Sequence, residues 1–192
     1  MNASTYQKNI AKNVVLATSA DKYHVFNYVN DNGVSIDIME INNNPSNGIS
    51  TYATIGLSAH PLFFKGKELP VRAEIVGVCF NGTAGFDNVL ATLSFSVINS
   101  NWFCAPGIIF PDVVAMYGLS KHLTDIFFTY PYLWGENLQE TEIDGQKIGW
   151  LLAIPISKSE TDYAVQHGPD KLEDLFEAHS INIFDLNRPS VV

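Results

Sequence analysis

The segment 150–188 constrains the fold of this 192-residue chain more than any other part of it. An apolar run at its start has the length of one buried strand, which we expect over 148–154. Pro155 is expected to end this strand, because proline cannot donate a hydrogen bond to a central ladder. Ser157 and Glu160 stand at the spacing of a capping box, which predicts a helix directly after the strand.

The rest of this segment predicts an acidic helical surface and then a second strand. Over the range 158–176, Leu172, Leu175 and Phe176 share one helical face, whereas the carboxylates fall largely elsewhere. The range 181–188 is expected to form the second strand. Since the segment places no nucleophile beside a base and contains no metal-ligand cluster, it favours binding over catalysis.

The chain is acidic, with a net charge of -9. Eleven of its twenty carboxylates lie between Glu136 and Asp185, against three lysines, so the negative charge is concentrated in the C-terminal third. Nucleic acid binding needs a clustered basic surface, and only eleven Lys and Arg residues are scattered along the chain, so no direct nucleic acid contact is expected. A basic protein is the more plausible partner, and an ordinary solvated acidic face is the alternative.

The cysteines and the N-terminus indicate the compartment. Cys79 and Cys104 stand in apolar surroundings without redox or metal spacing, and we expect reduced core thiols. Residues 1–19 lack the apolar region of a signal peptide, and no run approaches the roughly eighteen apolar residues of a membrane span. A cytoplasmic protein without membrane contact is therefore expected.

The whole chain, 1–192, is expected to form one domain. A helix capped by Ser4 or Thr5 should end near Ser19, and the turn residues at 30–33 predict a hairpin. The segment 86–98 has helical spacing, with a strand left open as the alternative. The expected strands are 23–29, 34–41, 51–57, 71–80, 126–130 and 148–154. This pattern predicts an α+β fold, a mainly antiparallel mixed sheet with helices packed on it.

Further residues are expected to hold the framework together. Gly56 should permit a bulge or a close backbone approach at a strand end. Arg72 and Glu74 lie two apart on one strand and hence on one face, which predicts a partly buried ion pair. Asp185 and Arg188 would complete this charge network if the C-terminal segment docks alongside.

No catalytic, cofactor or metal site is expected. The five histidines show no zinc-site spacing. His122, Asp125 and Ser120 contain the residue types of a catalytic triad, but they lie within one short segment and lack the strained turn of a nucleophile elbow. A hydrolase that uses His122 or the scattered carboxylates is the residual alternative.

Five short pieces, in this order along the chain, resemble the suppressor-of-fused domain of bacterial proteins. They are Tyr52–Ser58, Arg72–Glu74, Pro131–Trp134, Pro155–Glu160 and Asp185–Arg188. The resemblance extends from about Ile10 to Val192 and is greatest to immunity proteins that are paired with LXG-type secreted toxins. It implies a mixed α/β domain without catalytic activity, which neutralises a cognate toxin, often a nuclease such as a DNase, inside the producing cell.

Toxin binding is thus the first functional hypothesis. Carboxylates would steer a basic toxin domain toward the chain, and exposed aromatic residues beside Pro131 would anchor it. The expected contact residues are Asp162, Asp170, Glu173, Asp174, Glu177, Tyr132 and Trp134. The alternative is a non-catalytic regulatory or scaffold module that binds a host protein or peptide through an exposed strand edge.

Overall fold

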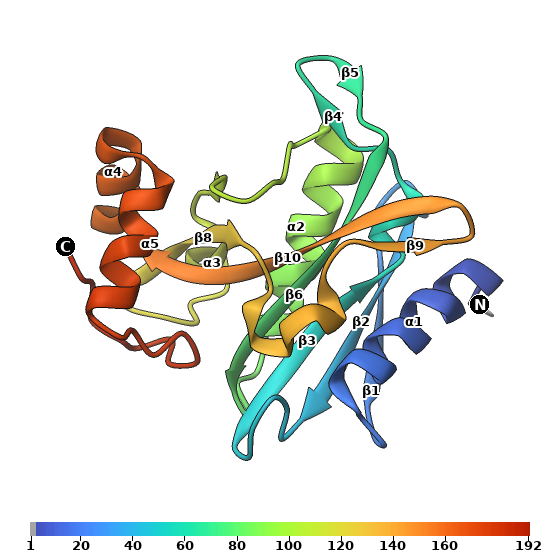
Figure 1. Cartoon of the computed structure of the whole chain (residues 1–192), viewed down its shortest axis with the longest axis horizontal. Helices are drawn as coiled ribbons and strands as arrows, with labels where there is room; N and C mark the ends of the chain where they lie inside the picture. Colours follow the sequence, from blue (N-terminus) through green and yellow to red (C-terminus); the bar gives the residue numbers. More distant parts are fainter. Residues whose placement is uncertain (1–2) are drawn as a thin grey trace.

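The computed structural model describes residues 3–192, in which one eight-stranded sheet forms the centre of the molecule (Figure 1). The strands follow the order β1 (His24–Val29), β2 (Ser35–Asn42), β3 (Ile49–Ile55), β6 (Val71–Phe80), β10 (Gln146–Ser157), β8 (Leu123–Thr129) and β7 (Ile109–Phe110), with β9 (Thr141–Ile143) paired to β10. Neighbouring strands are antiparallel except β6 and β10, which run parallel. A separate hairpin consists of β4 (Phe63–Phe64) and β5 (Lys67–Glu68).

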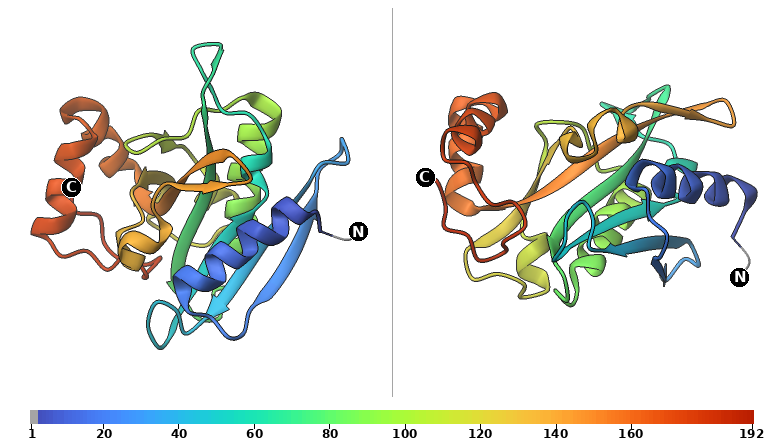
Figure 2. Two further views of the ribbon diagram at one scale, coloured as in Figure 1. Left: turned by 45° about the vertical axis from the view of Figure 1, so that its right-hand side comes forward. Right: turned by 60° about the horizontal axis from the view of Figure 1, so that its bottom comes forward.

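The sheet separates two apolar cores. Side chains alternate along a strand, so Ile75 and Val76 of β6 enter different cores. Ile75 belongs to the core that includes α2 (Phe86–Ser100), and Val76 belongs to the core that includes α1 (Thr5–Thr18). Figure 2 shows these two helices on opposite faces of the sheet.

Two further helices lie at the end of the sheet that holds β7 and β8, well away from β1 (Figure 1). They are α4 (Lys158–His167) and α5 (Pro169–Ala178). The short elements are η1 (Leu57–Ala59), α3 (Val113–Met116) and η2 (Tyr132–Leu138). No helix within residues 3–192 is both long enough and apolar enough to span a bilayer.

The expected fold class and several local elements are confirmed. Ser4 caps α1 by accepting a hydrogen bond from the Gln7 amide, and Ser19 ends the helix with left-handed backbone (φ 53°). Gly33 (φ 77°) lies in the turn between β1 and β2, which pair antiparallel as predicted. The segment 86–98 is helical, so the strand alternative is wrong. Both cysteines are buried free thiols.

Pro155 does not end its strand. β10 continues to Ser157, and Pro155 pairs with Ile126 of β8. The Pro155 carbonyl accepts a hydrogen bond from Arg188 Nη2 at 3.0 Å, so the edge of β10 that carries its nitrogen and oxygen faces away from β8. β6 pairs with β10 only as far as Ala153, and the missing N–H therefore leaves no ladder partner unsatisfied.

Two other expectations for the C-terminal segment are wrong. The range 181–188 forms successive turns instead of a strand. The single helix expected over 158–176 is divided at Gly168, whose positive φ of 94° precedes Pro169 at the start of α5. Proline favours this first helical position because it has no N–H to satisfy there.

Candidate partner-binding site

Glu74 holds the β3–η1 turn against β6. Its side chain is fully buried, and Oε1 accepts hydrogen bonds from the amides of Gly56 and Ser58, each at 3.0 Å. The Ser58 and Thr54 hydroxyls complete the contacts of the carboxyl group. Burial raises the pKa of Glu74 to about 7, because the cost of desolvating a carboxylate exceeds the effect of these hydrogen bonds. The carboxyl group thus serves the framework and lies out of reach of a partner.

The close neighbour of Gly56 is a side chain instead of another backbone segment, and the ion pair expected between Arg72 and Glu74 is wrong. Gly56 has a positive φ of 105°, and a Cβ placed there would lie 3.2 Å from the Gln7 side chain. Arg72 pairs with Glu68 instead, with Nη2 and Oε1 2.6 Å apart. Arg72 and Glu74 are two apart on β6, yet only Glu74 is enclosed by the β3–η1 turn.

The expected network of Asp185 and Arg188 with Arg72 and Glu74 is also wrong. Arg188 is buried and pairs with Glu160, with Nη1 and Oε1 2.7 Å apart. The Asp185 carboxylate accepts a hydrogen bond from the Asn187 amide at 2.8 Å. These contacts fasten the C-terminal segment to the beginning of α4, which places the preceding residues 180–183 beside α5.

Three of the predicted contact residues, Glu173, Glu177 and Tyr132, meet in a pocket between α5 and η2. Glu173 and Glu177 stand one helical turn apart on α5, and both line this pocket, which has a volume of about 470 Å³. Thr129, at the end of β8, donates a hydrogen bond to Glu173. We call this cavity the α5 pocket. Its lining consists of Thr129, Tyr132, Ile154, Glu173, Phe176, Glu177, Ser180, Ile181 and Ile183.

The α5 pocket combines an apolar lining with unneutralised negative charge. Within residues 3–192, neither Glu173 nor Glu177 forms an ion pair. Like charges four residues apart on a helix repel each other. A cation from outside the chain would relieve that repulsion, and the isoleucine and phenylalanine side chains would accommodate an apolar stem.

Tyr132 separates the α5 pocket from a second cavity. Its side chain is 58% exposed, and it also lines a cavity of about 440 Å³ together with Tyr130, Glu140 and Trp150. We call this cavity the η2 pocket. Partial burial and then the negative charge of Glu173 raise the pKa of the Tyr132 phenol. Neither lining includes Lys, Arg or His, so both pockets suit a cationic ligand that can also contact aromatic rings.

The aromatic residues near Pro131 differ from the expectation in which of them are buried and which are exposed. Trp134 is only 6% exposed, and its Nε1 donates a hydrogen bond to Asn44 Oδ1 at 3.1 Å, so the expected role as an exposed anchor is wrong. Tyr130, which was not among the predicted contact residues, is 71% exposed. Its position beside Pro131 and Tyr132 in the sequence was a signal that could have identified it.

The other predicted carboxylates lie outside both pockets. Asp162 pairs with Lys158 at 3.6 Å, and Asp174 pairs with Lys171 at 2.7 Å. Asp170 lies exposed in the first turn of α5, where a carboxylate favours the helix dipole. These three residues add to the acidic field of the α4–α5 surface but do not contribute to the α5 pocket.

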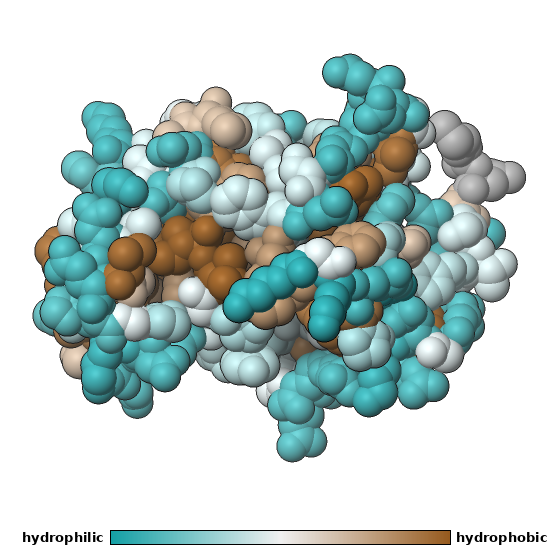
Figure 3. Space-filling view, turned by 90° about the horizontal axis from the view of Figure 1, so that it is seen from above, coloured by the Kyte–Doolittle hydropathy of each residue, from teal (hydrophilic) through white to brown (hydrophobic). Residues whose placement is uncertain are grey.

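Apolar residues are also visible on the surface in this half of the molecule. Figure 3, seen from above, shows them in one continuous area on the side that holds α4 and α5, with hydrophilic residues at its borders. Such a surface is typical of an interface, in which an apolar centre is surrounded by a polar rim.

The triad residue types near His122 are not assembled. The Asp125 carboxylate is buried and accepts hydrogen bonds from the Asp112 amide and from the hydroxyls of Thr124 and Thr161. Ser120 Oγ accepts hydrogen bonds from the amides of His122 and Leu123. The partners of Ser120 and Asp125 thus do not include the histidine ring, and these three residues do not form a catalytic triad. In residues 3–192 no three His, Cys, Asp or Glu side chains are grouped to hold a metal ion.

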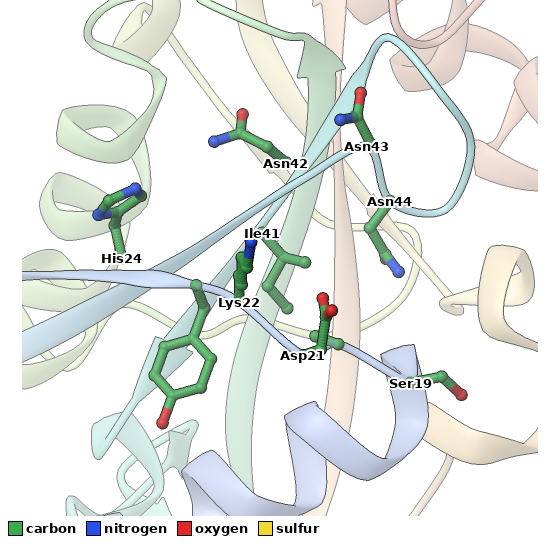
Figure 4. Close-up of a pocket in the computed structure, with 10 residues that line it drawn as sticks. Ser19, Asp21, Lys22, His24, Ile41, Asn42, Asn43 and Asn44 are labelled. Carbon is green, nitrogen blue, oxygen red and sulfur yellow. The ribbon is translucent and has the colours of Figure 1, made fainter.

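Another cavity, of about 750 Å³, lies between the α1–β1 connection and the end of β2 (Figure 4). Asn42, Asn43 and Asn44 line it. Their amide groups are used within the chain: Asn44 Nδ2 donates to the Thr18 carbonyl at 2.8 Å, and Asn42 Oδ1 accepts from Ser50 Oγ at 2.7 Å. Because these asparagines fasten the β2–β3 turn, we assign this cavity no partner.

The fold and sequence define the class of the chain, which belongs to the suppressor-of-fused family. The family model described as "Suppressor of fused protein (SUFU)" matches residues 32–189. A relative named "Immunity protein YqcF", from Bacillus subtilis (strain 168), is 40% identical over 189 residues and matches 98% of each chain.

Solved structures have the same fold. A putative SUFU homologue from Neisseria gonorrhoeae FA 1090 superposes with a TM-score of 0.71 at 18% identity, covering 97% of each chain. A chain of the Sufu–Fu complex gives a TM-score of 0.69 at 10% identity, covering 97% of this chain and 92% of that one. The expected family and fold are therefore confirmed.

Proposed function

We propose that this protein is a cytoplasmic immunity protein that binds a cognate toxin stoichiometrically and catalyses no reaction itself. Support comes from the relative named as an immunity protein, which is 40% identical over 98% of both chains. We also propose that the toxin is a secreted LXG-type protein with a nuclease, specifically DNase, domain. A nuclease must attract phosphate and therefore presents positive surface, which complements a chain of net charge -9.

The observation that carries this proposal is the α5 pocket. Glu173 and Glu177 line it without ion-pair partners within residues 3–192, beside the largely exposed ring of Tyr132. A lysine or arginine of the toxin would place its alkyl stem against Phe176 and its charge between the two carboxylates. Around this anchor, an interface of about 800 Å² per partner is of ordinary size.

Co-expression with the toxin encoded by the neighbouring gene tests the proposal. The wild-type chain should restore growth and co-purify with the toxin. Glu173→Lys/Glu177→Lys should lose both properties while it keeps its melting temperature. Asp112→Lys/Glu142→Lys changes the net charge equally at exposed positions outside both pockets and should still protect.

The pocket variant tests the contact site, and the wild-type chain tests the immunity function. Protection by a folded Glu173→Lys/Glu177→Lys variant would reject the α5 pocket as the contact site. Failure of the wild-type chain to protect against the neighbouring toxin would reject the immunity function.

A non-catalytic regulatory module is the second candidate. The open edge of β1 favours it, because an extended peptide can add to such an edge as a further strand. Pull-down of a host regulator by the wild-type chain, together with a gene neighbourhood that lacks a toxin, would favour this candidate over immunity.

A further inference from the structure

The β1 strand is an open edge at the end of the sheet remote from α5. Among the strands that the structure describes, it pairs with β2 alone. Its two faces carry exposed apolar side chains, since Val25 is 49%, Phe26 39% and Val29 53% exposed. Such an edge is a template for pairing with another strand.

Nothing in β1 protects this edge. Natural edge strands are commonly blocked by charged side chains, proline or a bulge. β1 reads His-Val-Phe-Asn-Tyr-Val, and its register with β2 is unbroken from His24–Glu40 to Val29–Ser35. The strand is therefore regular, contains no Asp, Glu, Lys or Arg, and is able to accept a neighbour.

The direction of the backbone groups fixes which residues would pair. The Asn30 amide donates to the Val34 carbonyl at 2.9 Å, so Asn30 and Val34 form a hydrogen-bonded pair at the hairpin end. Antiparallel ladders alternate between bonded and non-bonded pairs. The backbone groups of Val25, Asn27 and Val29 consequently point away from β2, toward the open edge.

We propose that β1 pairs antiparallel with β1 of a second copy of this chain, about a two-fold axis at Asn27. Val25 of each copy then faces Val29 of the other, and the two Asn27 residues face each other. Val25, Asn27 and Val29 are arranged symmetrically about Asn27. Their outward-pointing amides and carbonyls can therefore form hydrogen bonds with those of the other copy. On the other face of the ladder, Phe26 of each copy lies opposite Tyr28 of the other, which brings two aromatic rings together.

Charge at the ends of β1 favours a second copy over a basic toxin. Lys22 precedes the strand and Asp31 follows it, both are exposed, and neither forms an ion pair within residues 3–192. Antiparallel pairing brings Lys22 of each copy close to Asp31 of the other, so complementary charges flank the ladder at both ends. β1 itself offers no carboxylate to a cationic partner.

Pairing through β1 would continue the sheet through both copies and leave the α5 pockets at its two far ends. Each dimer could then hold two toxin molecules, one at each end. The dimer does not rest on the proposed immunity function, because its test uses the purified chain alone.

Sedimentation equilibrium of the full chain tests the proposal. The wild type should have twice the chain mass of 21.2 kDa. Val25→Lys/Val29→Lys and Val25→Glu/Val29→Glu should each be folded monomers, because like charges meet at both Val25–Val29 pairs. An equimolar mixture of the two variants should recover the dimer mass. As control, Leu16→Lys/Val165→Lys changes two side chains that are each 77% exposed and lie outside β1, and it should remain dimeric.

A monomeric wild type, or a folded lysine variant that keeps the dimer mass, would overturn the proposal. A cysteine cross-link tests the register even if the charged variants fail to fold. Asn27→Cys should form an intermolecular disulfide under mild oxidation, whereas Val165→Cys on α4 should not, because it lies far from the two-fold axis. Both native cysteines are buried and should not compete. Equal cross-linking of the two variants would also overturn the proposal.

Discussion

Arg188 and Glu160 form an ion pair whose side chains are 4% and 0% exposed. The contact is bidentate, since Nη1 lies 2.7 Å from Oε1 and Nη2 lies 2.9 Å from Oε2. Glu160 also accepts a hydrogen bond from the Ser157 amide, as the N3 residue of the capping box of α4. One carboxylate therefore joins the start of α4 to the C-terminal segment.

Loss of the Arg188–Glu160 ion pair should destabilise the fold. We expect Arg188→Ala to lower the free energy of unfolding by about 3–5 kcal/mol, because it leaves a buried carboxylate without its cation. Lys147→Ala is the control and should cost less than about 1 kcal/mol, because Lys147 and its partner Glu140 are 59% and 62% exposed. Urea denaturation measures both values. Equal losses in the two variants would contradict the assignment of Arg188 as the buried anchor.

Glu74 should make stability depend on pH. Its pKa is raised to about 7 by burial from an ordinary value of 4.5, so the folded state favours the protonated carboxyl group. The stabilisation is fully present below pH 4.5 and is lost as the pH rises to about 7, a change of roughly 3 kcal/mol. Glu74→Gln imitates the protonated form and should flatten the urea-denaturation profile in this window. A profile with the wild-type slope would show that Glu74 is not the titrating group.

Tyr132 and Trp134 should have opposite effects on stability and binding. Tyr132→Ala removes a largely exposed ring, and we expect toxin affinity to fall about tenfold or more with little change in melting temperature. Trp134→Ala creates a cavity and removes the bond to Asn44, so it should cost about 3–5 kcal/mol of stability. Calorimetric titration and thermal unfolding distinguish these effects. A binding loss confined to Trp134→Ala would exclude the surface around Tyr132.

The two carboxylates of the α5 pocket should raise the association rate in addition to holding the bound toxin. Glu173→Gln/Glu177→Gln keeps the shape of both side chains, so the rate constant for association should fall and depend less steeply on salt. Surface plasmon resonance at several ionic strengths measures this change. Association rates that match the wild type at every salt concentration would rule out steering by this pair.

Local sequence signals predicted much of the fold because their partners lie within a few residues. Ser157 and Glu160 form the predicted capping box, and Gly33 supplies the left-handed backbone of the β1–β2 turn. Pro155 was misjudged because its tolerance depends on β6 ending its pairing at Ala153. The pairing of β6 with β10 joins strands that lie far apart in the sequence, so local sequence signals do not show where it ends.

Contacts between residues that lie far apart in the sequence also determine the partners of the charged residues, and spacing along one strand does not predict them. Spacing along β6 suggested that Arg72 neutralises Glu74, but the β3–η1 turn encloses Glu74 and supplies neutral donors. Within the candidate site, Glu173, Glu177 and Tyr132 were predicted as contact residues, and the structure brings them to one pocket. Ile181 and Ile183 also line this pocket and were not predicted to do so. The range 181–188 was expected to form a strand, whereas it forms turns beside α5.

Titration of the toxin encoded beside this gene with the purified chain tests the central claim most directly. We expect toxin activity to fall linearly to zero at one molecule of this chain per toxin molecule, with the toxin left chemically intact. Undiminished toxin activity at excess chain, or inactivation by substoichiometric amounts with cleaved or modified toxin, would contradict inhibition by binding.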